Sequence, residues 1–309
     1  MSESNPAAAT QQTGPSVVED RGGLFYGIGA YTLWGIFPIY FRALSEVRPF
    51  TILCHRIVWS AMLLAVVVSL RREWGAIWPV LRSPRQILLL SAGAVLIALN
   101  WLIFIYAISS RQVLQASLGY FINPLLSIAL GMIFLGERLR AWQWVAVIVA
   151  AAAVGNQAFR GGELPWIAVS LAITFGFYGL VRKKIDINSL HALLVETSLL
   201  VPLSLIALAL LPASHFSPIT WSLLSLSGII TAVPLLLFGA AVRRLKLSTL
   251  GFLQYVGPSL QFAIAITLFD EHIESAKLIS FVLCWIAIGI YVVDSVLQRS
   301  SQPVADEPE

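Results

Sequence analysis

The sequence predicts an all-α integral membrane protein whose ten transmembrane helices form two inverted five-helix repeats. Composition is the first observation behind this prediction: 58% of the 309 residues are hydrophobic and only 12% are charged. Soluble domains have roughly 25% charged residues, and one soluble core could not hide so much apolar surface. Most of that surface must therefore face lipid or other membrane helices.

Ten apolar runs are the second observation, because each is long enough to cross about 30 Å of hydrocarbon. They cover residues 23–44, 50–70, 85–107, 113–135, 141–159, 165–182, 189–211, 221–242, 249–269 and 276–297. Most segments between them are short, so consecutive helices should pack antiparallel. Residues 1–22 and 298–309 have the polar composition of a disordered leader and a disordered tail.

The positions of Lys and Arg predict the orientation. If the N-terminus is cytoplasmic, fourteen of the 20 basic residues fall at cytoplasmic loops and helix ends, among them Arg182, Lys183 and Lys184 after the sixth span. Five fall at the outer edges, and Arg56 lies inside the second span. Because basic residues concentrate on the cytoplasmic side, both termini are predicted to be cytoplasmic.

An internal repeat is the third observation. A shift of 134 positions places residues 119–138 over 253–272, so that Pro124 falls on Pro258. A shift of 141 places His55 on Glu196.

The repeat divides the chain into two five-helix halves, residues 23–159 and 165–297. Each half has five spans, an odd number, so the second half must enter the membrane in the opposite orientation. Inverted repeats of this kind recur in secondary transporters, whose two halves open one site alternately to each side.

Several motifs carry a resemblance to a known family. They are LWGIFPIYF at 33–41, HRIVWS at 55–60, SLGYFINPL at 117–125, GERL at 136–139, FGFYGLVRK at 175–183, TAVPLLLFGAA at 231–241 and LSTLGFLQYVGPS at 247–259. In these blocks the chain resembles the RarD branch of the EamA-repeat drug/metabolite transporter superfamily. The resemblance implies a permease of the bacterial inner membrane that works by alternating access. Proteins of this branch are labelled chloramphenicol-sensitive, and the label does not identify a physiological cargo.

Ionisable residues inside the spans are the first candidates for function, since each costs roughly 2.5–3.5 kcal/mol at the bilayer centre unless it is paired or hydrated. His55 and Arg56 lie in the second span and Glu196 lies in the seventh. We expect Glu196 to couple transport to protons, while Arg56 and His55 bind an anionic or polar part of the cargo in a shared cavity. The alternatives are a structural Arg56–Glu196 ion pair or an Arg56 that reaches the outer interface.

Uncharged polar and aromatic residues form a second set of candidates. Those predicted to contact the cargo are Trp59, Asn100, Tyr120, Asn123, Gln254 and Tyr255. Interhelical hydrogen bonding is the alternative for Asn100, and interfacial anchoring is the alternative for the aromatic side chains. Pro124 and Pro258 each remove a helical hydrogen bond and are predicted helix breaks, with a packing kink as the alternative.

These features predict a proton-coupled secondary transporter for a small polar metabolite or drug-like compound. The alternative is a membrane sensor or scaffold without transport activity. We expect no enzyme activity, metal or cofactor, because the sequence has no HExxH, GxSxG, Walker or GxGxxG motif and its four His residues form no metal-ligand cluster. The predicted partners are the cargo and the lipid bilayer, not nucleic acid, and both a monomer and a homodimer remain open.

Overall fold

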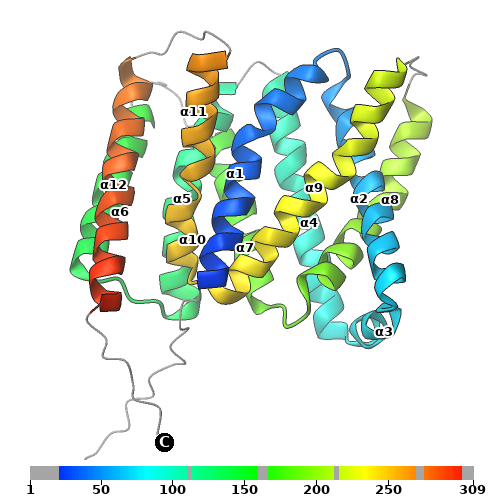
Figure 1. The fold of residues 1–309 in the computed structure, drawn as a ribbon, viewed down its shortest axis with the longest axis horizontal. Coiled ribbons are helices and arrows are strands. Elements are labelled where there is room, and N and C mark those ends of the chain that lie inside the picture. Colours follow the sequence, from blue (N-terminus) through cyan, green and yellow to red (C-terminus); the bar gives the residue numbers. More distant parts are fainter. Residues whose placement is uncertain (1–20, 110–112, 159–165, 212–215, 269–274, 301–309) are drawn as a thin grey trace, which may run out of the picture.

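The structure is a computed structural model that describes residues 21–109, 113–158, 166–211, 216–268 and 275–300. Within these ranges it is a bundle of helices without strands, which confirms the all-α class (Figure 1). The helices are α1 (Arg21–Ala43), α2 (Pro49–Arg71), α3 (Trp74–Arg82), α4 (Pro84–Ser109), α5 (Val113–Leu135), α6 (Ala141–Ala158), α7 (Trp166–Lys184), α8 (Ser189–Leu210), α9 (Pro218–Arg244), α10 (Leu247–Leu253), α11 (Val256–Leu268) and α12 (Ser275–Ser300).

Seven helical stretches of the described chain are long and apolar enough to cross a membrane. They are α1, α2, α4, α8, α9, α10 together with α11, and α12. The apolar parts of α5 and α6 are shorter, so ten crossings remain a prediction. One helix was not predicted: α3 lies in the expected loop after α2, where Ile77 and Val80 are buried while Trp74 and Trp78 are exposed.

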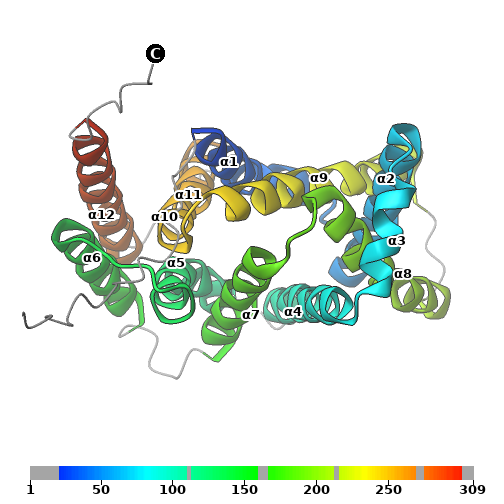
Figure 2. The ribbon, with the colours of Figure 1, turned by 90° about the horizontal axis from the view of Figure 1, so that it is seen from below.

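The helices form two facing sides with α6 and α12 together at one end (Figure 2). On one side α9 packs between α1 and α2, and on the other side α7 packs between α5 and α4. In the predicted repeat, α1 corresponds to α7, α2 to α8 and α4 to α9. The contacts of α9 with α1 and α2 therefore correspond to contacts of α4 with α7 and α8, and both of these are also present. The predicted pair of halves would make such matched contacts, and the division into repeats stays a prediction.

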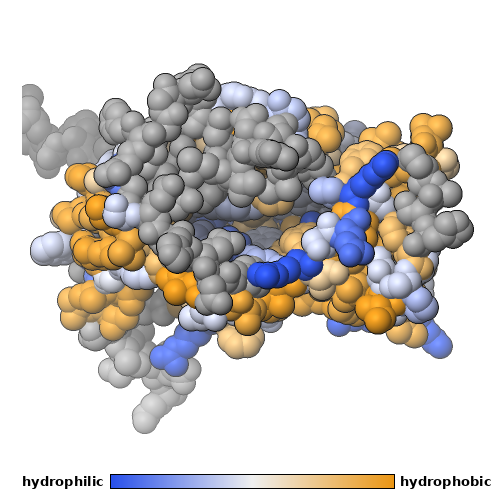
Figure 3. Space-filling model, turned by 90° about the horizontal axis from the view of Figure 1, so that it is seen from above, coloured by the Kyte–Doolittle hydropathy of each residue, from blue (hydrophilic) through white to orange (hydrophobic). Residues whose placement is uncertain are grey.

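The outer surface suits a lipid environment. Side chains such as Phe25, Leu70 and Leu210 are 74%, 79% and 81% exposed, which would be unfavourable for so many large apolar groups in water. Seen from the end opposite α3, hydrophobic residues occupy much of the rim while hydrophilic residues gather toward the middle (Figure 3).

The two prolines of the repeat have different effects. Helix α5 runs without interruption through Pro124, so the predicted break there is wrong. The predicted second-half span does break, at Gln254 and Tyr255 between α10 and α11. Pro258 has no N–H to donate to the Gln254 carbonyl, which instead accepts from Gly257 N at 3.3 Å. A single lost bond is tolerated in α5, whereas Gly257 beside Pro258 further weakens the helix in the second half.

Candidate substrate and coupling sites

Arg56 of α2 lies in a cage of aromatic rings. Its Nε donates a hydrogen bond to Oγ1 of Thr231 in α9 at 2.8 Å. The guanidinium carbon lies 5.9 and 5.5 Å from the ring centres of Phe37 and Phe41 in α1, and 5.3 Å from that of Trp101 in α4. These distances are in the range of cation–π contacts. We call these five residues the Arg56 cage.

The Arg56 cage has no negative charge to balance the guanidinium. The phenol groups of Tyr40 in α1 and Tyr120 in α5 interact with Arg56 electrostatically, so five helices converge here. Within the described ranges, no ion pair joins Arg56 to a carboxylate. Arg56 is half-buried. Its planar group therefore retains donors that could bind a carboxylate or phosphate in a two-point arrangement.

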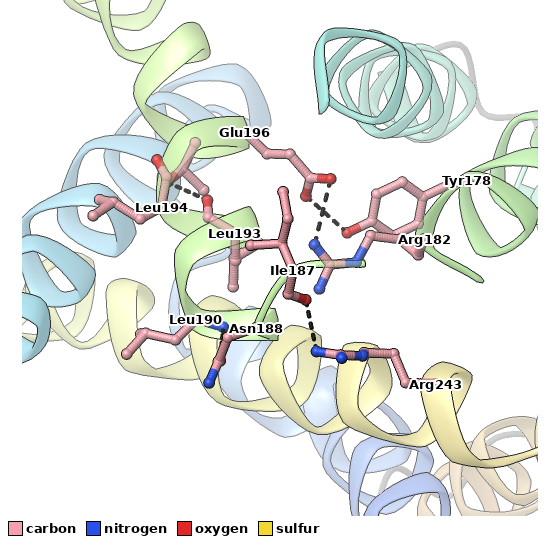
Figure 4. Close-up of polar contacts among 10 residues, drawn as sticks. Tyr178, Arg182, Ile187, Asn188, Leu190, Leu193, Leu194, Glu196 and Arg243 are labelled. Carbon is pink, nitrogen blue, oxygen red and sulfur yellow. Dashed lines mark hydrogen bonds and ion pairs between the residues drawn. The ribbon is translucent and has the colours of Figure 1, made fainter. Parts of the chain in front are cut away.

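Glu196 of α8 has a different environment, with two partners from α7 (Figure 4). Oε1 of Glu196 lies 3.4 Å from Nη1 of Arg182, and Oε2 accepts a hydrogen bond from the Tyr178 hydroxyl at 3.2 Å. The side chains of Glu196 and Arg182 are 1% and 3% exposed. We call Tyr178, Arg182 and Glu196 the Glu196 cluster. Because a buried ion pair is stable only when both charges are well partnered, its geometry constrains α7 against α8.

Two glycines make room for the Glu196 cluster. A Cβ atom at Gly93 of α4 would lie 2.7 Å from Oε1 of Glu196, and one at Gly239 of α9 would overlap Nη2 of Arg182. Any larger residue at either position would displace one of the charged groups. The cluster is thus enclosed by helices of both predicted halves.

The Arg56 cage and the Glu196 cluster are separate sites, contrary to the expected shared cavity and to the alternative Arg56–Glu196 ion pair. The reason is the direction of the helices, since α2 begins at the end of the bundle opposite the start of α8 (Figure 1). Both residues lie within about two turns of their helix starts, so they lie toward opposite ends of the bundle. The partner of Glu196 is Arg182, which the sequence placed among the cytoplasmic basic residues.

Four aromatic side chains lie between the two sites: Trp34, Phe175, Tyr178 and Phe238, which we call the aromatic layer. The Trp34 and Phe175 rings meet edge to face at 5.8 Å, and Phe175 and Phe238 lie 5.4 Å apart. Tyr178 stacks on Phe238 at 6.1 Å. Trp34 is one helical turn from Phe37 in the Arg56 cage, and Tyr178 belongs to the Glu196 cluster. The layer therefore separates the two charged sites near the middle of α1 and α7.

His55 and Trp59, the other candidates in α2, point to different surroundings. The His55 ring meets Trp221 of α9 edge to face at 5.4 Å, and within the described ranges it makes no polar or ring contact with the Arg56 cage or with Glu196. Trp59 lies one turn from Arg56, and its Nε1 is buried without a hydrogen-bond partner among the described groups. Trp59 thus has a donor to offer near the cage.

Asn100 makes the interhelical contact that was weighed as its alternative role. Its Nδ2 donates to the Leu171 carbonyl at 3.0 Å and to Thr174 Oγ1 at 2.9 Å. Both acceptors belong to α7, so Asn100 ties α4 to α7. Its neighbour Trp101 is the residue that reaches Arg56.

The candidates near the two prolines divide between the cage and the contact of α5 with α10. Tyr120 contributes to the electrostatic surroundings of Arg56. Gln254 donates from Nε2 to Ser127 Oγ at 3.3 Å. The Tyr255 hydroxyl donates to the Phe121 carbonyl at 3.4 Å, in a core formed largely with α6 and α12. Asn123 is 8% exposed, and its Oδ1 has no hydrogen-bond partner in the described ranges.

Sequence reasoning missed several residues of these sites, Arg182 and Thr231 among them. Arg182 was hidden among the basic residues at the end of a span, although its position four residues after Tyr178 places both on one helix face. Thr231 offered no signal, because it contacts Arg56 from 175 positions away. Only the packing of α2 against α9 brings it there.

A bundle of apolar helices that encloses a few paired or caged charges defines a multi-pass membrane protein. Residues 21–155 match the EamA-like transporter family. The chain is 48% identical over 288 residues to an "Uncharacterized transporter" of Vibrio cholerae, covering 91% of this chain and 95% of that protein. It is 45% identical over 284 residues to "Protein RarD" of Escherichia coli, covering 90% and 96%.

The chain therefore belongs to the EamA-like transporter family, in its RarD branch, and the Vibrio cholerae relative is named as a transporter. A more distant relative in Pseudomonas aeruginosa, 29% identical with 88% of this chain and 94% of that protein covered, is named "Chloramphenicol-sensitive protein RarD". A solved structure, described only as the crystal structure of a protein, shares the fold. Its TM-score is 0.70 at 17% identity, covering 89% of this chain and 98% of that one.

Proposed function

We propose that this transporter moves a small organic compound with an anionic group across the bacterial inner membrane by alternating access, coupled to protons. In this proposal both termini are cytoplasmic. One observation carries the proposal: Arg56 is half-buried, meets side chains from α1, α4, α5 and α9, and forms no ion pair with a carboxylate of the described chain. A charge at this depth is unfavourable without a partner, and a bound anion would supply one.

The Arg56 cage favours an anion that also has an apolar part. Thr231 holds Nε of Arg56, which fixes the plane of the guanidinium and leaves the terminal amino groups for a carboxylate or phosphate. The rings of Phe37, Phe41 and Trp101 would pack against the apolar part of the cargo. Trp59 Nε1 is a further donor one turn away.

The Glu196 cluster is the proposed coupling site. A carboxyl group removed from water can bind a proton reversibly, and protonation would remove one charge of the Arg182–Glu196 pair. That pair and the Tyr178 hydrogen bond hold α7 to α8. We infer that proton binding weakens this contact and lets the aromatic layer open toward the end of the bundle where the basic last turns of α7 and α9 lie.

The matched helix contacts support alternating access. Trp34 and Phe175, which occupy equivalent positions of the predicted halves, contact each other directly. When two halves are related by a two-fold axis, a residue and its equivalent can contact each other only near that axis. Opening at one end could then accompany closing at the other, as in transporters built from inverted repeats.

Ligand binding gives the first test. Purified protein would be screened for thermal stabilisation by organic anions, cations of similar size and neutral compounds, chloramphenicol among them. A ligand present at 100 times its Kd should stabilise the protein by about 2.7 kcal/mol. We expect anions to stabilise the wild type and to lose this effect in Arg56→Gln. Arg85→Gln, which changes an exposed arginine at the start of α4, is the control.

Transport in proteoliposomes gives the second test, with an anion found in that screen. We expect Glu196→Gln to exchange the anion across the membrane but not to accumulate it under a pH gradient. If Glu196→Gln does not fold, the double variant Arg182→Gln/Glu196→Gln tests the same point without a lone buried charge. Gradient-driven accumulation by either variant would contradict the coupling role. Absence of both binding and transport in the wild type would favour the sensor or scaffold alternative.

A further inference from the structure

Helix α3 runs in a different direction from the helices around it. In Figure 1 it is seen nearly end-on at the lower edge of the bundle, where α2 and α8 run up and down. Seen from below in Figure 2, it crosses from the end of α2 toward the start of α4. Its nine residues are too few to span a bilayer. In a membrane that the bundle crosses, α3 therefore lies along the surface.

The apolar side chains of α3 share one side of the helix, and the bundle covers only part of them. Ile77 and Val80 are buried, at 5% and 8% exposed. Trp74, Trp78 and Leu81 are 49%, 57% and 45% exposed. At 100° per residue, the five side chains fall within about 160° of the helix circumference, with the buried pair at one edge. We call Trp74, Trp78 and Leu81 the α3 surface arc.

The two tryptophans suit the boundary between lipid headgroups and acyl chains. Trp74 Nε1 donates to Ser69 Oγ in α2 at 2.9 Å, which orients its indole ring. The Arg82 guanidinium lies 5.0 Å from the centre of the Trp78 ring. Trp is enriched at this boundary because its ring is apolar while its N–H is polar. An amphipathic helix at a bilayer surface turns such a face toward the acyl chains.

Basic side chains lie at both ends of α3. Arg71 and Arg72 precede the helix and Arg82 ends it, and all three are exposed. Glu73 is the single acidic residue between Arg71 and Arg82. Clusters of basic residues next to a bilayer attract anionic phospholipids. The charge around the α3 surface arc is thus complementary to an anionic membrane surface.

The position of α3 is fixed by its contacts with α8. Glu73, the N-cap residue of α3, has Oε2 2.8 Å from Nε2 of His191 in the first turn of α8. The buried residues Ile77 and Val80 belong to the same hydrophobic core as Leu190 of α8. The α3 surface arc is therefore held in a defined place at the edge of the bundle.

We propose that the α3 surface arc docks onto the anionic phospholipids of the leaflet at this end of the bundle, the cytoplasmic leaflet in the proposed topology. Trp74, Trp78 and Leu81 would lie at the acyl-chain boundary, with Arg72 and Arg82 among the headgroups. The exposed face of three side chains is too small for a stable protein interface, which buries about 800 Å² per partner. Size and charge together therefore favour lipid as the occupant.

Spin labelling of the full chain in nanodiscs tests where the α3 surface arc lies. Nitroxides at Trp78→Cys and Leu81→Cys report on the arc. A nitroxide at Gly75→Cys reports on the other side of α3, where an added Cβ has no atom within 4 Å. The native Cys54 and Cys284 are buried, so the introduced thiol is the exposed one. We expect labels at 78 and 81 to meet oxygen more often than a water-soluble nickel complex, and the label at 75 to show the reverse.

Titration with phosphatidylglycerol tests the charge. Thermal unfolding would be measured in phosphatidylcholine micelles with increasing phosphatidylglycerol. Each basic residue near an anionic surface contributes a factor of about five in affinity. We expect Arg72→Gln and Arg82→Gln each to raise the phosphatidylglycerol concentration for half-maximal stabilisation about fivefold. Arg48→Gln, an exposed position before the start of α2 and thus at the opposite end of the bundle, should leave it unchanged.

Three results would overturn the proposal. Labels at 78 and 81 that meet the nickel complex as often as the label at 75 would show that the arc faces water. Protection of these labels from both reagents would assign the arc to a contact with another protein chain. Wild-type dependence on phosphatidylglycerol in the double variant Arg72→Gln/Arg82→Gln would exclude the headgroup contacts. None of these measurements depends on transport, so the lipid surface can fail independently of the proposed function.

Discussion

Nη1 of Arg182 lies 3.4 Å from Oε1 of Glu196, and neither side chain is more than 3% exposed. The two residues belong to consecutive helices, α7 and α8, and sit 14 positions apart in the chain. The most buried charged groups of the candidate sites therefore pair with each other between α7 and α8, and neither of them pairs with Arg56. It also makes the stability of the protein depend on both partners at once.

A double-mutant cycle should show this dependence. Arg182→Gln or Glu196→Gln alone leaves one buried charge without its partner, which should lower the free energy of unfolding by about 3–5 kcal/mol. The double variant should lose much less than the sum, because no lone charge remains. The corresponding cycle at the exposed pair Arg243–Asp186 is the control and should show little coupling. Additive losses at the buried pair, measured by denaturant unfolding in detergent, would contradict its role.

Gly93→Ala should disturb the same pair from a third helix. The added methyl group would lie 2.7 Å from Oε1 of Glu196, so the carboxylate must move and the protein should lose about 1–3 kcal/mol of stability. Gly289→Ala in α12 is the control, because a Cβ there has no atom within 4 Å. Equal melting temperatures for the two variants would show that the space beside Glu196 is not limiting.

Thr231→Val should weaken anion binding without unfolding the protein. The substitution keeps the shape of the side chain but removes the acceptor for Arg56 Nε. A hydrogen bond to a charged group contributes about 1.5–3 kcal/mol, so we expect the Kd for an anionic ligand to rise by roughly tenfold or more. Thr267→Val is the matched control, since Thr267 Oγ1 donates to Ala263 O within its own helix α11. An unchanged Kd in calorimetric titrations would separate Thr231 from the site.

Glu137→Ala should destabilise the start of α10. The Glu137 carboxylate accepts from Leu247 N at 2.7 Å, from Ser248 N at 3.0 Å and from Ser248 Oγ at 2.7 Å. Loss of a helix-capping acceptor costs about 0.5–2 kcal/mol. Glu46→Ala, at an exposed position in the turn before α2, should change stability by much less. Amide hydrogen exchange of α10 would locate the effect, and unchanged protection there would argue against a capping role.

Much of the fold could be predicted because the membrane imposes simple rules. Apolar runs of about twenty residues must be helical in lipid, since every backbone polar group needs a partner. The runs predicted the helices of the described chain with modest shifts of their ends. They missed α3, whose nine residues are amphipathic rather than uniformly apolar. The length of the apolar runs could not show that α5 continues through Pro124 whereas the helix of the second half is interrupted between α10 and α11, before Pro258.

The candidate site was predicted only as a set of unusual residues. His55, Arg56 and Glu196 were selected because charges inside apolar spans are rare, and this reasoning does not specify their partners. Arg182 and Thr231 had no such signal, since one looked like a helix-end charge and the other like a packing residue.

The sequence by itself therefore determined the class of protein, its helical character and the few charges that must be accommodated in lipid. These follow from composition and spacing, which act locally along the chain. Only the tertiary structure decided that Glu196 pairs with Arg182 and that Arg56 lies among aromatic rings. Such pairings depend on which helices pack together and in which direction each one runs, and residues far apart in the chain acquire their partners only through that packing.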